Sequence, residues 1–260
     1  MADGRIAFVE EYLGRVSVLE DGSVRTLAHL GGAPNGLAVD GDGQIWVAQN
    51  GGVVGDWRSD RPVAPSIVRI DPGTGFAETV ATTASGFELQ APNDLCVGPD
   101  GAIWFTDPGL YGPLPRTDHG RICRLADGRE AEIVHQLGQV YPNGIATTVT
   151  GQVLWTESRT RRVVTSDGTS IRTIIELDEP AMPDGCTFLP DGTLAVASLG
   201  SRGIHLIRDL EGRTTADLWR FTPGCNATNC IVDGDSLIVT DVATTQHDGR
   251  LWRVPLGSRP

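Results

Sequence analysis

Short apolar runs separated by turn residues recur five times along the chain. Each repeat opens with an Asn or Asp, continues as an apolar strand, makes a Gly- or Asp-containing turn and enters a second apolar strand. Runs of this length, bounded by Gly, Pro, Asn and Asp, are typical of β-strands. The opening residues, called anchor residues below, are Asn35, Asn93, Asn143, Asp184 and Asn229. The second strands are expected at Ile45 to Ala48, Ile103 to Thr106, Val153 to Thr156, Leu194 to Ala197 and Leu237 to Thr240.

The repeats keep a nearly constant register. The distance from anchor residue to second strand is 11 residues for Asn35 to Trp46, Asn93 to Trp104 and Asp184 to Ala195, and 12 for Asn143 to Trp155. Successive anchor residues are 58, 50, 41 and 45 residues apart. A third strand follows each pair, and in four of the five repeats a fourth strand follows the third. These intervals match the blades of a β-propeller.

A further blade is expected before the first anchor residue. The segments Arg5 to Val9, Gly14 to Leu19 and Val24 to Leu30 fit its second, third and fourth strands. The sequence therefore predicts one all-β domain over residues 1–260, a six-bladed β-propeller with four-stranded antiparallel blades and an incomplete first blade. The missing inner strand would lie upstream of Met1, so we expect the natural protein to start roughly 15 to 20 residues earlier.

Charge and cysteine content narrow the classes of function. A net charge of -12 disfavours binding to nucleic acid or to an anionic membrane surface, because the field of the protein would repel phosphates. No apolar run reaches the roughly 20 residues of a spanning helix, and no signal peptide pattern opens the chain. Five cysteines without metal-site spacing suit reduced, packed thiols. These features predict a cytoplasmic protein; they leave its oligomeric state open.

The anchor residues are candidates for chemistry because of where propeller strands begin. The first strand of each blade lines the central channel, so these residues are expected to meet at one mouth of that channel. A single Asn or Asp after Pro usually caps a turn. Five in register favour a ring of amide and carboxylate oxygens, which is the ligand set that a hard cation such as calcium prefers.

A second set of polar residues ends the second strands at the same mouth. Its members are Asn50, Asp107, Glu157, Ser198 and Asp241, interpreted either as substrate contacts or as solvated loop residues. Two longer loops, Gly51 to Pro65 with Trp57 and Gly109 to His119 with Tyr111, are expected either to cover the mouth or to be tolerated insertions. Of the histidines, only His247 lies where a base could face the mouth.

Several sequence motifs together resemble those of the gluconolactonase and regucalcin (senescence marker protein) family of six-bladed propellers. They are Ala91 to Leu95 with Trp104 to Pro108, Tyr141 to Gly144, Met182 to Cys186, and Ala227 to Cys230 with Ile238 to Asp241. In that family one divalent ion is held by a first-blade Glu and by an Asn and an Asp that match Asn143 and Asp184. The Asn matching Asn93 stands beside the ion and touches substrate or water.

The resemblance implies a metal site made of Asn143, Asp184 and Asn93, with Asp184 also the catalytic proton acceptor and donor. Asn93, Asp107 and Asn229 form the expected substrate contacts. Two positions depart from the family pattern. Ala91 stands where some sugar lactonases carry Arg, which weakens the case for a polyhydroxylated lactone. The first-blade Glu has no match, and Glu10 or Glu11 is the alternative source of that carboxylate.

These features predict a divalent-metal-dependent lactonase, a carboxylic ester hydrolase acting on a small lactone or ester. One cation is expected, calcium first, with zinc, manganese and magnesium as alternatives. Two rival functions are an organophosphate or other ester hydrolase on the same site, and a non-catalytic propeller that binds a metabolite. No GxSxG elbow or phosphate-binding glycine loop supports other chemistry.

Overall fold

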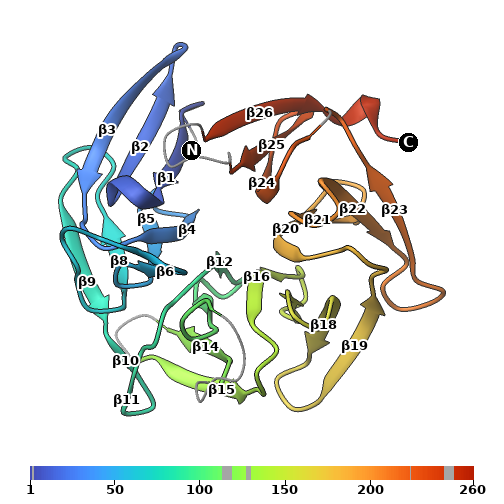
Figure 1. Cartoon of the computed structure of the whole chain (residues 1–260), viewed down its shortest axis with the longest axis horizontal. Helices are drawn as coiled ribbons and strands as arrows, with labels where there is room; N and C mark the ends of the chain where they lie inside the picture. The colour runs from blue at the N-terminus through green and yellow to red at the C-terminus, as the bar shows by residue number, and fades with distance from the viewer. Residues whose placement is uncertain (2, 113–118, 127–129, 223, 243–248) are drawn as a thin grey trace. The chain divides into compact units, whose positions relative to one another are not determined.

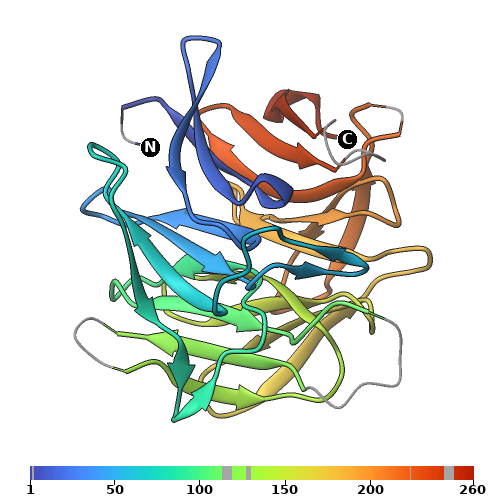
Figure 2. The same cartoon turned by 60° about the vertical axis from the view of Figure 1, so that its left-hand side comes forward.

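The computed structural model describes residues 1, 3–112, 119–126, 130–222, 224–242 and 249–260. The protein is an all-β, six-bladed β-propeller whose strands form antiparallel sheets (Figures 1 and 2). Contacts along the chain divide it into two compact units, residues 1–139 and 140–260. Each unit contains three blades and is described by itself.

The first unit holds blades one to three. Blade one consists of β1 (Ile6–Glu10), β2 (Arg15–Glu20) and β3 (Ser23–His29), with the 3-10 helix η1 (Glu11–Leu13) between β1 and β2. Blade two consists of β4 (Pro34–Val39), β5 (Ile45–Gln49), β8 (Ser66–Ile70) and β9 (Ala77–Ala81). Blade three consists of β12 (Leu95–Val97), β13 (Ile103–Asp107), β14 (Arg121–Leu125) and β15 (Glu132–Gln136).

The first unit contains two small hairpins in addition to its blades. The first, β6 (Val53–Val54) with β7 (Trp57–Arg58), is inserted between β5 and β8 of blade two. The second, β10 (Thr83–Ala84) with β11 (Phe87–Glu88), connects blade two to blade three. The loop expected over the mouth at Gly51 to Pro65 thus contains a hairpin of its own.

The second unit holds blades four to six. Blade four consists of β16 (Pro142–Thr147), β17 (Val153–Glu157), β18 (Arg162–Ser166) and β19 (Ile171–Glu176). Blade five consists of β20 (Pro183–Phe188), β21 (Leu194–Ser198), β22 (Gly203–Arg208) and β23 (Thr215–Trp219). Blade six consists of β24 (Ala227–Asp233), β25 (Ser236–Asp241) and β26 (Arg250–Pro255), and the 3-10 helix η2 (Leu256–Ser258) follows.

The six blades confirm the predicted repeat. Every expected second strand is present and runs one residue further than the sequence suggested, as in β13 and β17. In the described part of the chain β1 pairs only with β2, so blade one lacks an inner strand as expected. The sequence predicted a single domain. That expectation stays a prediction, because contacts along the chain divide it into two compact units.

Hydrophobic packing between neighbouring blades holds each unit together. Second strands such as β5 and β21 are buried along their whole length, because the faces of the sheet pack against other blades on both sides. One cluster joins blades five and six through Leu206, Val239 and Val254. All five cysteines are free thiols and four are buried, consistent with a packing role. No helix in the described residues is long and apolar enough to cross a membrane.

Candidate functional site at the anchor residues

Three of the five anchor residues lie in bulges at the start of their strands. The pairing register between β16 and β17 shifts between Pro142 and Ile145, so Asn143 and Gly144 form a bulge. Equivalent shifts place Asn35 of β4 and Asp184 of β20 in bulges, whereas in β24 the shift falls at Thr228 and Asn229 pairs with Thr240. A bulge leaves one residue out of the ladder and re-aims its side chain. The repeated Asn or Asp is therefore placed where it can point away from the sheet.

Close approach of neighbouring strands explains the glycine after several anchor residues. A Cβ atom at Gly144 would lie 2.4 Å from the backbone oxygen of Asp184, and one at Gly185 would lie 2.1 Å from Asn229 Oδ1. In the first unit, Gly36 donates its amide to the oxygen of Asn93 at 2.7 Å. The glycines let successive anchor segments pack side by side.

In the second unit, the hydroxyl of Ser158 links Asn143 to the next anchor segment. Asn143 is buried, and its Nδ2 atom donates to Ser158 Oγ at 3.1 Å. Ser158 Oγ in turn donates to the oxygen of Pro183 at 2.7 Å. Because Nδ2 faces Ser158, the amide oxygen of Asn143 is directed away from Ser158. That oxygen is the atom with which an Asn ligates a hard cation.

A second hydroxyl makes a parallel link. Thr156 Oγ1 accepts the amide of Gly144 at 2.9 Å and donates to the backbone oxygen of Asp184 at 2.7 Å. The structure therefore brings Asn143 and Asp184 together, as the sequence predicted for a shared site. Sequence reasoning missed Ser158 and Thr156. The sequence did contain a signal for these hydroxyls, since Thr156 and Ser158 flank Glu157, the last residue of β17.

Asn229 lies beside the same segment. Its Oδ1 atom accepts the amide of Cys230 at 2.8 Å, and its backbone amide donates to Thr240 Oγ1 at 2.8 Å. Its side chain packs over Gly185, the residue after Asp184. Three expected site residues of the second unit are thus neighbours, although substrate contact by Asn229 stays a prediction.

In the first unit, the half-buried Glu11 lies between two asparagines. The Nδ2 atoms of Asn35 and Asn50 lie 3.3 and 3.4 Å from Glu11 Oε1. Burial raises the pKa of the Glu11 carboxyl to about 7. Glu10, the other candidate, points elsewhere: it pairs with Arg15 at 2.8 Å and accepts the hydroxyl of Ser17. Of the two carboxylates that the sequence offered, Glu11 is the one next to an anchor residue.

Asn93 is buried at the start of blade three. Its backbone amide donates to the oxygen of Thr106 at 3.0 Å, and its backbone oxygen accepts the amide of Gly36. The backbone of Asn93 is thereby fixed between blades two and three. Its expected contact with metal or substrate stays a prediction.

The residues that end the second strands hold the backbone ahead of the anchor residues. Asp107 is 0% exposed; its Oδ1 atom accepts the amides of Gln90 at 3.0 Å and Ala91 at 2.7 Å, and Arg121 Nη1 lies 3.3 Å from Oδ2. Ser198 Oγ accepts the amide of Met182 at 3.0 Å.

The same contact recurs in blades two and six. Gln49 Oε1 accepts the amide of Ala33 at 2.7 Å, and Asp241 Oδ1 accepts the amide of Asn226 at 2.8 Å. All four residues are buried and are called clamp residues below: Gln49, Asp107, Ser198 and Asp241. From their positions in the sequence, Asp107, Ser198 and Asp241 were interpreted as substrate contacts or as solvated loop residues. They are not solvated, and the structure shows each of them bound to a backbone amide.

The donor chemistry of these residues fits a hard cation. Among the described residues no three His, Cys, Asp or Glu side chains form a group that could hold a metal ion. A cation would therefore need amide oxygens as well as carboxylates, and Asn143 next to Asp184 offers one of each. His247 and residues 113–118 of the second loop lie outside the described residues.

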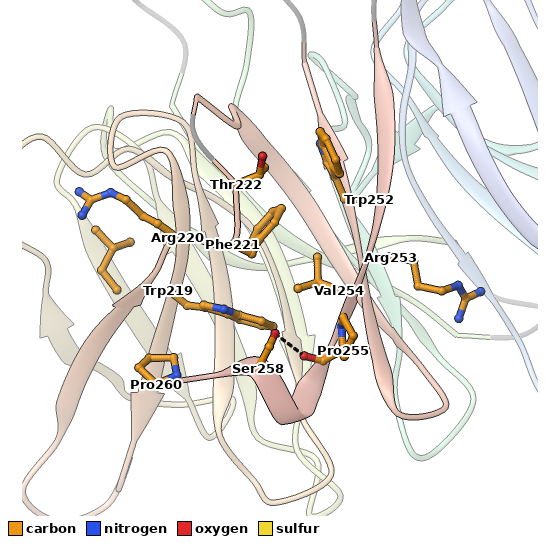
Figure 3. Close-up of a pocket in the computed structure, with 11 residues that line it drawn as sticks. Trp219, Arg220, Phe221, Thr222, Trp252, Arg253, Val254, Pro255, Ser258 and Pro260 are labelled. Carbon is orange, nitrogen blue, oxygen red and sulfur yellow. Dashed lines mark hydrogen bonds between the residues drawn. The ribbon is translucent and has the colours of Figure 1, made fainter.

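The second unit also has a surface groove of 740 Å³ along β23 and β26 (Figure 3). It is lined by residues such as Trp219, Phe221, Trp252 and Val254, and Ser258 Oγ donates to the oxygen of Pro255 at its lower edge. The rings of Trp219 and Phe221 meet edge to face at 5.9 Å. None of the predicted site residues lines this groove.

The protein belongs to the class of six-bladed β-propellers, and polar anchor residues lie at the start of the inner strands of five of its blades. A family model described as the SMP-30/gluconolactonase/LRE-like region matches residues 63–243. The chain belongs to this family.

Known relatives agree with that assignment. A gluconolactonase of Zymomonas mobilis is 30% identical over 118 residues, which cover 43% of this chain and 30% of that protein. The chain thus spans about a third of the length of this curated relative. Among solved structures, a gluconolactonase of Xanthomonas campestris has a TM-score of 0.76 at 25% identity, covering 98% of this chain and 82% of that chain. A calcium-binding regucalcin of Agrobacterium tumefaciens shares the fold, with a TM-score of 0.72 at 18% identity, covering 95% and 81%.

Proposed function

We propose that this protein hydrolyses a small lactone with the help of one divalent cation held by Asn143 and Asp184. The observation that carries the proposal is the pair of hydroxyls, Ser158 and Thr156, that hold the Asn143–Gly144 segment against the backbone of Pro183 and Asp184. Family membership supports lactonase chemistry. Oxygen ligands favour calcium over softer metals.

Each residue has a definite task in the proposed reaction. A bound divalent cation supplies Lewis-acid polarisation of the ester carbonyl. Asn143 and Asp184 offer the oxygens that hold it. Asp184 also takes a proton from the attacking water and returns it to the ring oxygen as the carbon–oxygen bond breaks, which yields the open hydroxy acid. Asn93 donates a hydrogen bond to the carbonyl oxygen, where negative charge develops.

Of the two carboxylates that could replace the first-blade Glu of the family pattern, Glu11 lies beside the anchor residue Asn35, with Oε1 3.3 Å from Asn35 Nδ2. Glu10 is instead paired with Arg15. Asp107, expected from the sequence as a substrate contact, is proposed instead to position the backbone that leads into Asn93, because both of its oxygens are engaged inside the protein.

A lactone panel tests the proposal. The purified protein is assayed with several γ- and δ-lactones and with a phosphotriester, with calcium, magnesium, manganese or zinc, and after chelation. We expect lactone hydrolysis that is lost on chelation and restored by calcium. Turnover of the phosphotriester alone, or no turnover with any metal, would reject the proposed function.

A further inference from the structure

Three of the six asparagines in the chain are followed by glycine: Asn35–Gly36, Asn50–Gly51 and Asn143–Gly144. Asparagine loses its side-chain amide most readily before glycine, because glycine has no side chain to hinder attack by its own backbone nitrogen. At Asn143 the packing requires this pair, since a Cβ atom at Gly144 would lie 2.4 Å from the oxygen of Asp184. The close approach of two anchor segments thus gives Asn143 a reactive neighbour.

Deamidation of Asn143 consists of a defined series of bond changes. The backbone nitrogen of Gly144 attacks Cγ of Asn143, so that a bond from this nitrogen to Cγ forms and the bond from Cγ to Nδ2 breaks. The nitrogen loses its proton, Nδ2 leaves as ammonia, and a succinimide ring remains. Water then opens the ring on either side of the nitrogen and leaves aspartate or isoaspartate. Water is the only co-reactant, so the reaction needs no other molecule.

Both partners of this reaction are held by hydroxyl groups in the second unit. The amide of Gly144 donates to Thr156 Oγ1 at 2.9 Å, and Nδ2 of Asn143 donates to Ser158 Oγ at 3.1 Å. Attack requires the nitrogen of Gly144 to face Cγ of Asn143, so the peptide plane between the two residues must rotate. Rotation breaks the bond to Thr156 and leaves a buried amide without its acceptor, which costs free energy.

The hydroxyl of Thr156 has a fixed orientation. Thr156 is 0% exposed, and its hydroxyl donates to the backbone oxygen of Asp184 at 2.7 Å. Because the proton of the hydroxyl is directed at Asp184, a lone pair of Oγ1 is left to accept the amide of Gly144. An acceptor that is itself held by a hydrogen bond keeps the amide in place between local openings of the fold.

The other two Asn–Gly pairs lie in the first unit and depend on different acceptors. Gly36 donates to the backbone oxygen of Asn93 at 2.7 Å, and Gly51 donates to Gln49 Oε1 at 3.1 Å. Neither bond involves Thr156. These two pairs are therefore references within the same molecule, because a substitution of Thr156 that acts only locally leaves their rates unchanged.

We infer that Asn143 is a latent site of deamidation, and that the hydroxyl of Thr156 protects it by holding the amide of Gly144. Deamidation replaces the neutral amide of an anchor residue by a carboxylate, and in isoaspartate it also lengthens the main chain by a methylene group. The protection requires neither metal nor substrate. It can therefore be tested whatever the outcome for the proposed function.

The test follows deamidation at each of the Asn–Gly pairs by peptide mass spectrometry while the purified protein ages at physiological temperature and pH. Thr156→Val replaces the hydroxyl by a methyl group, and Thr156→Ser keeps the hydroxyl as the matched control. We expect Asn143 to deamidate about ten-fold faster in Thr156→Val than in wild type, and Thr156→Ser to stay within about two-fold of wild type, because one buried hydrogen bond separates them. The rates at Asn35 and Asn50 should be the same in all of these proteins.

Two results would overturn the inference. One is an equal rate of deamidation at Asn143 in wild type and Thr156→Val. The other is an equal acceleration at every Asn–Gly pair, since the whole fold and not this hydroxyl would then protect Asn143. If Thr156→Val does not fold, wild type in urea provides the comparison: Asn143 should deamidate at least about ten-fold faster in urea than in the native protein. Equal rates there would also overturn the protection.

Discussion

The anchor residues and the clamp residues are neighbours in the ladder, yet they do different work. Pro34, just before Asn35, pairs with Gln49, and Pro183, just before Asp184, pairs with Ser198. Each clamp residue turns its side chain onto a backbone amide of the adjoining segment. In these two blades the anchor residue lies in the bulge that follows. The clamp residues use their polar atoms for the fold, whereas the proposed site is built from anchor residues.

This difference teaches how a polar residue at a strand end acquires its role. Backbone donors that no strand partner satisfies need an acceptor from a side chain when they are buried. Asp107 satisfies two such donors in the segment before β12, those of Gln90 and Ala91. We therefore expect substitutions of clamp residues to lower the stability of the fold, and substitutions of anchor residues to lower the affinity for metal.

The largest expected effect is on the stability of a clamp variant. Asp107→Ala leaves the guanidinium of Arg121 buried without its carboxylate, and should lower the free energy of unfolding by about 3 to 5 kcal/mol in urea denaturation. Asp100→Ala is the matched control, because Asp100 is half exposed in its pair with Arg124 and should cost about 1 kcal/mol or less. Equal losses of unfolding free energy in the two variants would contradict the structural role assigned to Asp107.

The next effect separates two anchor residues. Asn143→Ala should weaken calcium binding by at least about ten-fold in titration calorimetry, because it removes a proposed ligand. Asn35→Ala should change the affinity by less than about three-fold, because Asn35 only supports Glu11 and Asn50 supports it as well. A stronger effect at Asn35 would mean that other anchor residues hold the cation.

A smaller loss of stability is expected for Ser198→Ala. The substitution leaves the part-buried amide of Met182 and the buried amide of Ser201 without their acceptor, which should cost about 1 to 2 kcal/mol. The exposed Ser258 serves as the control, and Ser258→Ala should stay within about 0.5 kcal/mol of wild type. If urea denaturation shows no difference between the two variants, Ser198 is not a clamp residue.

The smallest effect concerns a buried histidine that belongs to neither set. Burial lowers the pKa of His205 below 6.5, Arg220 lowers it further and Asp178 opposes the shift; Ser201 Oγ lies 2.8 Å from Nε2. The unfolded chain then binds the proton more readily, so stability is complete above pH 6.5 and falls as the pH drops below it. Between pH 7.5 and 5.5, wild type should lose up to about 1 kcal/mol more than His205→Gln. Identical losses would refute this.

Sequence predicted the blades and the anchor residues because both repeat. A phrase that returns at blade-sized intervals fixes the strand order and marks the start of each first strand. That repeat led us to expect the segments of Asn143 and Asp184 beside each other, but not the hydroxyls of Ser158 and Thr156 that join them. The roles of Asp107 and Ser198 did not follow from the repeat, since an Asp or Ser at a strand end looks the same whether it meets substrate or a backbone amide.

Glu11 could not be singled out for a related reason. Its environment is set by Asn35 and Asn50, residues 24 and 39 positions further along the chain. The sequence does not distinguish Glu10 from Glu11, because the direction of each side chain depends on the backbone conformation at the end of the strand. The structure separates them: Glu10 ends β1 and pairs with Arg15, whereas Glu11 begins the 3-10 helix η1 and lies beside Asn35 and Asn50.

The most direct test of the central claim is calcium titration of wild type and Asp184→Asn by calorimetry. This substitution removes the charge and keeps the size of the side chain, and the bond from Thr156 to the backbone oxygen of residue 184 is unaffected. We predict one calcium ion per wild-type chain and about a hundred-fold weaker binding in Asp184→Asn, because the amide oxygen lacks the charge of the carboxylate ligand. The melting temperature of the two proteins without metal should be the same. Equal calcium affinity in the two proteins would contradict the account.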